Sequence, residues 1–72
     1  MKSIDLHGVK HNDVQKVLDS FFWEMITKNV GHFQVITGNS DKMKEIVYEL
    51  CEEYGFEIDE ELNNSGSLII FC

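Results

Sequence analysis

Two long stretches of the chain repeat apolar residues at steps of three and four, which is the spacing of one face of a helix. They cover about residues 12–28 and 40–54. Each stretch therefore predicts an amphipathic helix with one buried face. The apolar positions are Val14, Val17, Leu18, Phe21, Phe22, Met25 and Ile26 in the first helix, and Met43, Ile46, Val47, Leu50, Cys51 and Tyr54 in the second.

The residues around the first stretch predict where this helix begins and ends. Asn12 is a suitable N-cap, because its side-chain oxygen can accept a hydrogen bond from a free backbone N–H of the first turn. Asn29 and Gly31 follow the last apolar position as stop signals. Trp23 lies off the apolar face of the helix. We expect it to flank the core, the alternative being an exposed contact residue.

The second helix is expected to begin at an N-cap of Asn39 or Ser40 and to end at Gly55. The centres of the apolar faces of both helices, together with the centres of the strands, predict the core. The side chains that we expect to be almost fully buried are Phe21, Phe22, Ile46, Leu50, Ile36 and Ile4.

Four shorter segments outside the helices have the composition or alternation of strands. They are residues 2–6, 33–37, 56–61 and 68–71, with a hairpin turn at residues 63–66. The order of elements is therefore βαβαββ. We predict a single α/β domain of residues 1–72, an α+β two-layer sandwich in which two helices cover one face of a four-stranded mixed sheet. We expect a monomer, although the last strand would be able to pair with a second chain if it lay at a sheet edge.

Length and composition support a globular domain. The chain has 72 residues, 43% of them hydrophobic, and no apolar run long enough to span a membrane. Because the first residues lead directly into a strand-like segment, we expect no signal peptide and a cytoplasmic location. Cys51 lies on the apolar face of the second helix and Cys72 is the last residue, so we expect two thiols and no disulfide.

The net charge of −7 is unevenly distributed. Residues 1–44 hold six lysines and five carboxylates, a sum of +1, whereas residues 45–72 hold eight carboxylates and no lysine or arginine, a sum of −8. An acidic protein is an unfavourable partner for a polyanion. The positive groups nevertheless gather after two glycine turns, at Lys10, His11, Lys42 and Lys44. The alternative interpretation is an acidic surface that only keeps a small protein soluble.

Two of the predicted strands end in polar residues and a glycine, just before a helix begins. Asp5 and His7 are two residues apart, a spacing that places both side chains on the same face of a strand. Gly8 and Gly38 permit tight turns at the ends of these strands. If the strands are neighbours, the turns lie together and the backbone N–H groups of residues 39–42 are free at a helix start, where anions bind. The sequence therefore predicts a phosphodiester site at the strand ends.

The segments DLHG at positions 5–8 and TGNS at positions 37–40 resemble the two signatures of the small MutS-related (Smr) domain family. These signatures are a D-x-H-G motif and a later glycine loop of the form HGxG or TGxG. The resemblance covers nearly the whole chain. It departs from the family at Ser40, where a second glycine is usual, and at Thr37, where many nuclease members have histidine. A stand-alone domain of this size resembles those common in bacteriophage genomes. This resemblance implies that the protein is located in the cytoplasm of a bacterial cell, including a phage-infected one.

The resemblance implies a fold similar to the C-terminal domain of translation initiation factor 3 and an endonuclease that acts on RNA or DNA. Asp5, His7 and Gly8 match the first motif, and Thr37 and Gly38 match the second. His7 would exchange a proton with the attacking hydroxyl or the leaving oxygen, and Asp5 would orient its ring. The backbone N–H groups of residues 38–41 would face the phosphate, and no cofactor or metal is expected. The residues expected to contact nucleic acid are Gly8, Lys10, His11, Thr37, Gly38, Asn39, Ser40 and Lys42.

Two other interpretations of these residues remain open. In the first, Asp5 only hydrogen-bonds the neighbouring turn, His7 closes that turn, and the domain is an inactive module that binds a protein partner through its acidic surface or Trp23. In the second, His7 and His11 hold a metal, which we disfavour because Gly8 interrupts any helix that would place them on one face.

Overall fold

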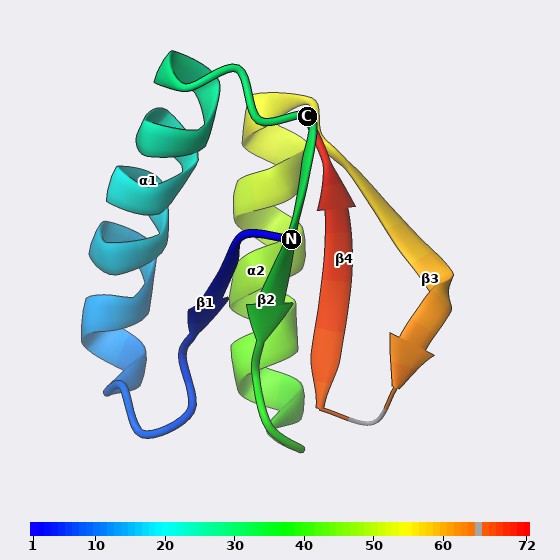
Figure 1. The fold of residues 1–72 in the computed structure, drawn as a ribbon. Helices are drawn as coiled ribbons and strands as arrows, with labels where there is room; N and C mark the ends of the chain where they lie inside the picture. Colours follow the sequence, from blue (N-terminus) through cyan, green and yellow to red (C-terminus); the bar gives the residue numbers. More distant parts are fainter. Residues whose placement is uncertain (65) are drawn as a thin grey trace.

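The computed structural model describes residues 1–64 and 66–72, with side chains outside residues 60–64. The elements are β1 (Ser3–Asp5), α1 (His11–Thr27), β2 (His32–Ile36), α2 (Asp41–Tyr54), β3 (Glu57–Asn64) and β4 (Ser67–Phe71), as Figure 1 shows. The predicted order βαβαββ is confirmed, and each element begins or ends within a few residues of its predicted bounds. The protein is a mixed α/β structure with one four-stranded sheet and two helices.

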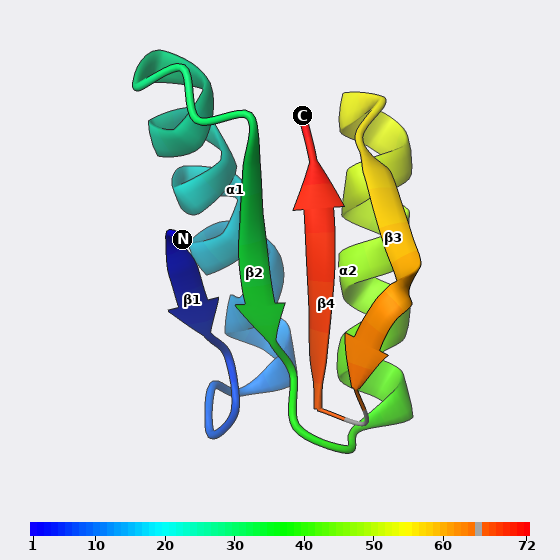
Figure 2. The ribbon, with the colours of Figure 1, turned by 45° about the vertical axis from the view of Figure 1, so that its right-hand side comes forward.

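The strands lie in the order β1-β2-β4-β3. β1 runs parallel to β2, whereas β4 runs antiparallel to both of its neighbours, so the sheet is mixed as predicted. β4 lies inside the sheet, between β2 and β3 (Figure 2), and the two edges are β1 and β3. The last strand is therefore not available for pairing with a second chain, because both of its sides are already hydrogen-bonded.

Both helices cover the same face of the sheet and pack beside each other, and the opposite sheet face stays open (Figures 1 and 2). Neither helix of the described residues is long and apolar enough to cross a membrane. The ring of Phe22 on α1 lies 5.5 Å from that of Phe33 on β2 and 5.0 Å from that of Phe56. The buried core consists of Leu6, Val14, Leu18, Phe22, Met25, Phe33, Val35, Met43, Val47, Leu50, Cys51, Leu68 and Ile70.

The core is narrower than the sequence predicts. Of the six side chains expected to be almost fully buried, Phe22 and Leu50 are buried, whereas Ile4, Phe21, Ile36 and Ile46 are only half-buried. Ile4 lies on a three-residue edge strand, and Ile36 alternates with the core residue Val35 and so points to the open face. Phe21 and Ile46, on the helices, pack against the buried core from outside it. The prediction is therefore wrong for these four side chains.

The apolar face of α1 is also narrower than predicted. Val17 and Ile26 are 37% and 39% exposed, so they are not core residues. Trp23 is 59% exposed, which excludes the expected place at the flank of the core. Because two helices cover only one sheet face, α1 has no neighbour over much of its circumference, and these three side chains lie there.

The ends of α1 differ in part from the prediction. The N-cap is Lys10, which makes no side-chain capping bond, and Asn12 lies inside the first turn. At the other end Asn29 adopts a left-handed φ of 56°, and the N–H of Val30 donates to the carbonyl of Met25 at 2.9 Å. This is the pattern of a Schellman C-cap, so Asn29 ends the helix as expected.

The ends of α2 agree with the prediction. The Ser40 hydroxyl accepts a hydrogen bond from the N–H of Met43 at 3.1 Å and is the N-cap. Gly55, at φ 74°, ends the helix, and the following N–H of Phe56 donates to the Cys51 carbonyl at 2.9 Å. Both termini are thus stabilised by the residues that the sequence marks for this purpose.

The hairpin between β3 and β4 is tighter than the four-residue turn predicted. β3 continues to Asn64, which pairs with Ser67 across the sheet, after an irregularity in register that follows Asp59. Ser65, part of the predicted turn, lies outside the described residues. The tight hairpin places Gly66 at the end of the sheet where β1 and β2 also end.

Both cysteines are free thiols, as predicted, with Cys51 buried and Cys72 exposed. Burial raises the pKa of the Cys51 thiol to about 12, with the neighbouring Cys72 as a smaller cause. The Cys72 thiol donates to the Val30 carbonyl at 3.3 Å. Cys51 is therefore an unreactive core residue at neutral pH.

Candidate functional site

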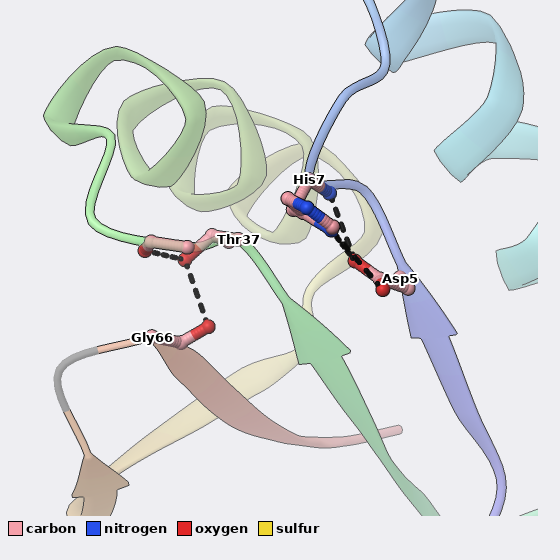
Figure 3. Close-up of polar contacts among 5 residues, drawn as sticks. Asp5, His7, Thr37 and Gly66 are labelled. Atoms are coloured by element: carbon pink, nitrogen blue, oxygen red, sulfur yellow. Dashed lines mark hydrogen bonds and ion pairs between the residues drawn. The ribbon is translucent and has the colours of Figure 1, made fainter.

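The parallel pairing of β1 and β2 brings the two glycine turns together. Asp5 pairs with Ile36, and the ladder continues with the N–H of Leu6 donating to the Ile36 carbonyl at 2.8 Å. A Cβ atom built on Gly38 would lie 3.7 Å from the Cβ of His7. His7 and the start of the second turn are therefore in contact distance, as the sequence predicts (Figure 3).

Asp5 holds His7 through backbone and side chain. Its Oδ1 accepts the backbone N–H of His7 at 3.0 Å and lies 3.2 Å from the ring Nδ1, while Oδ2 lies 3.3 Å from the same nitrogen (Figure 3). The backbone bond forms an Asx turn, which orients the segment after β1. Both side chains face solvent: that of His7 is 73% exposed and that of Asp5 is 53% exposed. A polymer can therefore reach the imidazole without a change in the fold.

The backbone hydrogen bond from His7, followed by the bond to its ring, lowers the pKa of Asp5 below its usual value. Asp5 is therefore ionised at neutral pH, and an ionised carboxylate only accepts hydrogen bonds. The hydrogen of a neutral His7 ring must then lie on Nδ1, facing Asp5. This leaves the lone pair of Nε2 free to accept a proton.

Leu6 determines how Asp5 and His7 are presented. It lies between them in the sequence and is completely buried in the core. Its burial keeps the two flanking polar side chains outside. The chain then turns through Gly8 at φ 88°, where the N–H of Val9 donates to the Leu6 carbonyl at 3.0 Å. A left-handed φ of this kind favours glycine.

Thr37 is not placed to bind a phosphate, contrary to expectation. Its side chain is buried, and the hydroxyl donates toward the carbonyls of Gly38 at 2.9 Å and Gly66 at 3.4 Å (Figure 3). The N–H groups of Thr37 and Gly38 both donate to the Gly66 carbonyl, at 2.8 and 3.0 Å. Gly38 thus has no N–H to offer, and Thr37 instead ties the turn to the β3–β4 hairpin.

Gly66 is the residue of this region that sequence reasoning missed. Its carbonyl accepts two backbone N–H groups from the turn after β2. The only signal in the sequence is its place in a turn-like NNSG segment, which indicates a hairpin but not what the hairpin contacts.

The backbone N–H groups of residues 39–42 are free at the start of α2 in the described part of the chain, as the sequence predicts. They donate to no acceptor within the described residues, and Ser40 uses its side chain for the N–H of Met43. Free N–H groups at a helix start carry partial positive charge toward the solvent. They would favour the binding of an anion at the end of the sheet where β1 and β2 end.

The cationic side chains near this edge are exposed. Lys10 and Lys42 make no ion pair within the described part of the chain, and His11 is the exposed first residue of α1. Lys44 is half-buried and already has an interaction. Asp13 and Asp41 lie in the first turns of the two helices, so the local charge is mixed and not uniformly basic.

The remaining histidine interpretation is a metal site at His7 and His11. Among the described residues, no three side chains of histidine, cysteine, aspartate or glutamate are close enough to hold a metal ion. His32 lies at the start of β2, opposite Phe71, with the two rings 5.8 Å apart. It is therefore at the far end of the sheet from His7.

Comparison of the chain with protein-family models, with curated proteins and with solved structures gave no match. The Smr resemblance therefore depends on the DLHG and TGNS segments and their placement. The geometry of these two segments is what remains to indicate a function.

Proposed function

We propose that this chain is an Smr-like nucleic-acid-binding protein that cleaves phosphodiester bonds of RNA or DNA at the strand-end edge of β1 and β2. The observation that carries the proposal is the Asp5–His7 pair, held beside Gly38 and facing solvent. The free N–H groups of residues 39–42 support it, because they lie on the turn that continues from Gly38.

The proposed reaction uses His7 as a proton carrier. Nε2 accepts the proton of an attacking hydroxyl, either water or an RNA 2′-hydroxyl, as the new oxygen–phosphorus bond forms. The bond from phosphorus to the leaving nucleoside oxygen then breaks, and the imidazolium returns the proton to that oxygen. Asp5 stabilises the imidazolium and fixes the ring orientation. General acid–base catalysis of this kind accelerates a reaction by about 10²–10⁴-fold.

Phosphate binding would come from the N–H groups after Gly38 and from Lys10 and Lys42. The Ser40 hydroxyl is occupied as an N-cap, so Ser40 would contribute its backbone N–H group rather than its side chain. With so few cations, salt should weaken binding only gently, with about one unit of slope for each lysine that reaches a phosphate.

The test is incubation of the protein with labelled single-stranded and double-stranded RNA and DNA, with and without a chelator. Cleavage should survive chelation, and His7→Ala should reduce it by about 10²-fold or more without unfolding the exposed site. His32→Ala is the matched control, since it removes an exposed histidine at the opposite end of the sheet. Equal activity of His7→Ala and wild type would refute the role of His7.

A second candidate function is an inactive protein-interaction module. A groove between α1 and α2 is lined by Ile46 and Leu50 and bordered by Glu49, Glu52 and Glu53. Trp23 on the outer side of α1 is 59% exposed. If wild type neither binds nor cleaves any of the four nucleic acids, this function is favoured. A lysine-rich peptide should then bind, and Glu53→Gln should weaken that binding.

A further inference from the structure

A shallow hollow lies between the β1–α1 loop, which follows the Asp5–His7 pair in the chain, and the first turns of α1. Gly8, Val9 and Lys10 line it from the loop, and Lys16 and Val17 line it from the helix. The loop and the start of α1 are the blue segments at the lower left of Figure 1. Gly8, the residue that follows His7 in the chain, is one of the lining residues.

The floor of the hollow is apolar. Val9 is half-buried against the core, and Val17 is 37% exposed although its spacing predicts a core position. Exposed valine surface next to a polar site is a surface on which the flat face of a base can pack. A single base would cover both side chains and remove apolar area from water.

The rim of the hollow is basic in an otherwise acidic protein. The chain has 13 carboxylates and six lysines, yet Lys10 and Lys16 both line this hollow and neither makes an ion pair within the described residues. Asp13 is the one carboxylate among the lining residues. Two free ammonium groups over an apolar floor complement a ligand that has an apolar face and a phosphate on either side.

We propose that this hollow receives the unpaired nucleotide next to the phosphate that His7 attacks. The base packs on Val9 and Val17, and Lys10 and Lys16 contact its flanking phosphates. The inference rests on the proposed function and adds a substrate class, single-stranded nucleic acid or an unpaired loop. A base in a duplex reaches the hollow only after unpairing and unstacking, which costs a few kcal/mol.

The test compares two glutamate substitutions on one helix. Val17→Glu places a negative charge on the floor of the hollow, and Ile26→Glu places the same charge on α1 outside it, at nearly equal exposure of 37% and 39%. Affinity is measured by fluorescence anisotropy with a labelled single-stranded RNA, the same sequence as DNA, and the blunt duplex of each. Val17→Glu should weaken single-strand binding on the order of tenfold, the size of one base contact, and leave duplex binding near wild type. Ile26→Glu should leave both unchanged.

A second pair of variants tests the charges of the hollow and leaves its apolar floor unchanged. Lys16→Gln should weaken single-strand binding and lower its salt slope by about one unit, whereas Lys28→Gln, at the other end of α1 beside Glu24, should not. If cleavage depends on His7 but Val17→Glu and Ile26→Glu bind alike, the hollow is refuted and the proposed function stands. If wild type binds no nucleic acid, both are refuted. Stronger binding of RNA than DNA, or the reverse, decides which polymer the hollow takes.

Discussion

Replacing Gly38 by alanine should destabilise the domain through backbone strain alone. Gly38 has a φ of 66°, where a side chain costs about 1–2 kcal/mol. Alanine also restricts the unfolded chain, which returns about 0.4–1 kcal/mol. The added Cβ would meet only the Cβ of His7, at 3.7 Å, an ordinary contact that adds no penalty. The expected net loss is therefore about 1 kcal/mol.

Gly31→Ala is the matched control, because Gly31 is outside the left-handed region and nothing lies within 4 Å of its added Cβ. It should gain about 0.4–1 kcal/mol from the unfolded state, so the two variants should differ by about 1–2 kcal/mol. Gly8→Ala, at φ 88° with nothing within 4 Å, should lose about as much as Gly38→Ala. Urea unfolding followed by circular dichroism measures each free energy. Equal stability of Gly38→Ala and Gly31→Ala would refute the argument from strain.

Further predictions concern a helix cap and the effect of alkaline pH. Ser40→Ala removes the hydrogen bond to the Met43 N–H and should lower the free energy of unfolding by about 1 kcal/mol, while Ser3→Ala, in an exposed position, should change it little. The hydrogen bond that Tyr54 donates to Asp19 raises the pKa of Tyr54 from 10.0 to about 12. The unfolded chain loses this proton first, so stability should fall as pH rises from about 10 to about 12, and Tyr54→Phe should reduce this dependence in urea titrations. An identical pH dependence in Tyr54→Phe would contradict this assignment.

Much of the local structure could be predicted from the sequence because its causes lie within a few residues. The three-and-four spacing of apolar residues predicts both helices, and Ser40, Gly55 and Asn29 mark their ends through hydrogen bonds to the adjacent turn. The two-residue spacing of Asp5 and His7 likewise brings them together, through an Asx turn at the end of β1. These features depend on periodicity and on hydrogen bonds between residues close in the sequence, which each segment carries by itself.

The strand order, the partners of the turns and the exposure of the helix faces depend on packing between segments that are distant in the sequence. No pattern in the last strand indicates that β4 inserts between β2 and β3, or that the Gly66 carbonyl then occupies the N–H groups of Thr37 and Gly38. Periodicity likewise identifies a face of α1 but not how much of it a neighbour covers, so Val17 is exposed beside the β1–α1 loop instead of buried. A residue's own sequence neighbours determine its conformation, whereas its burial and its partners depend on segments that only folding brings beside it.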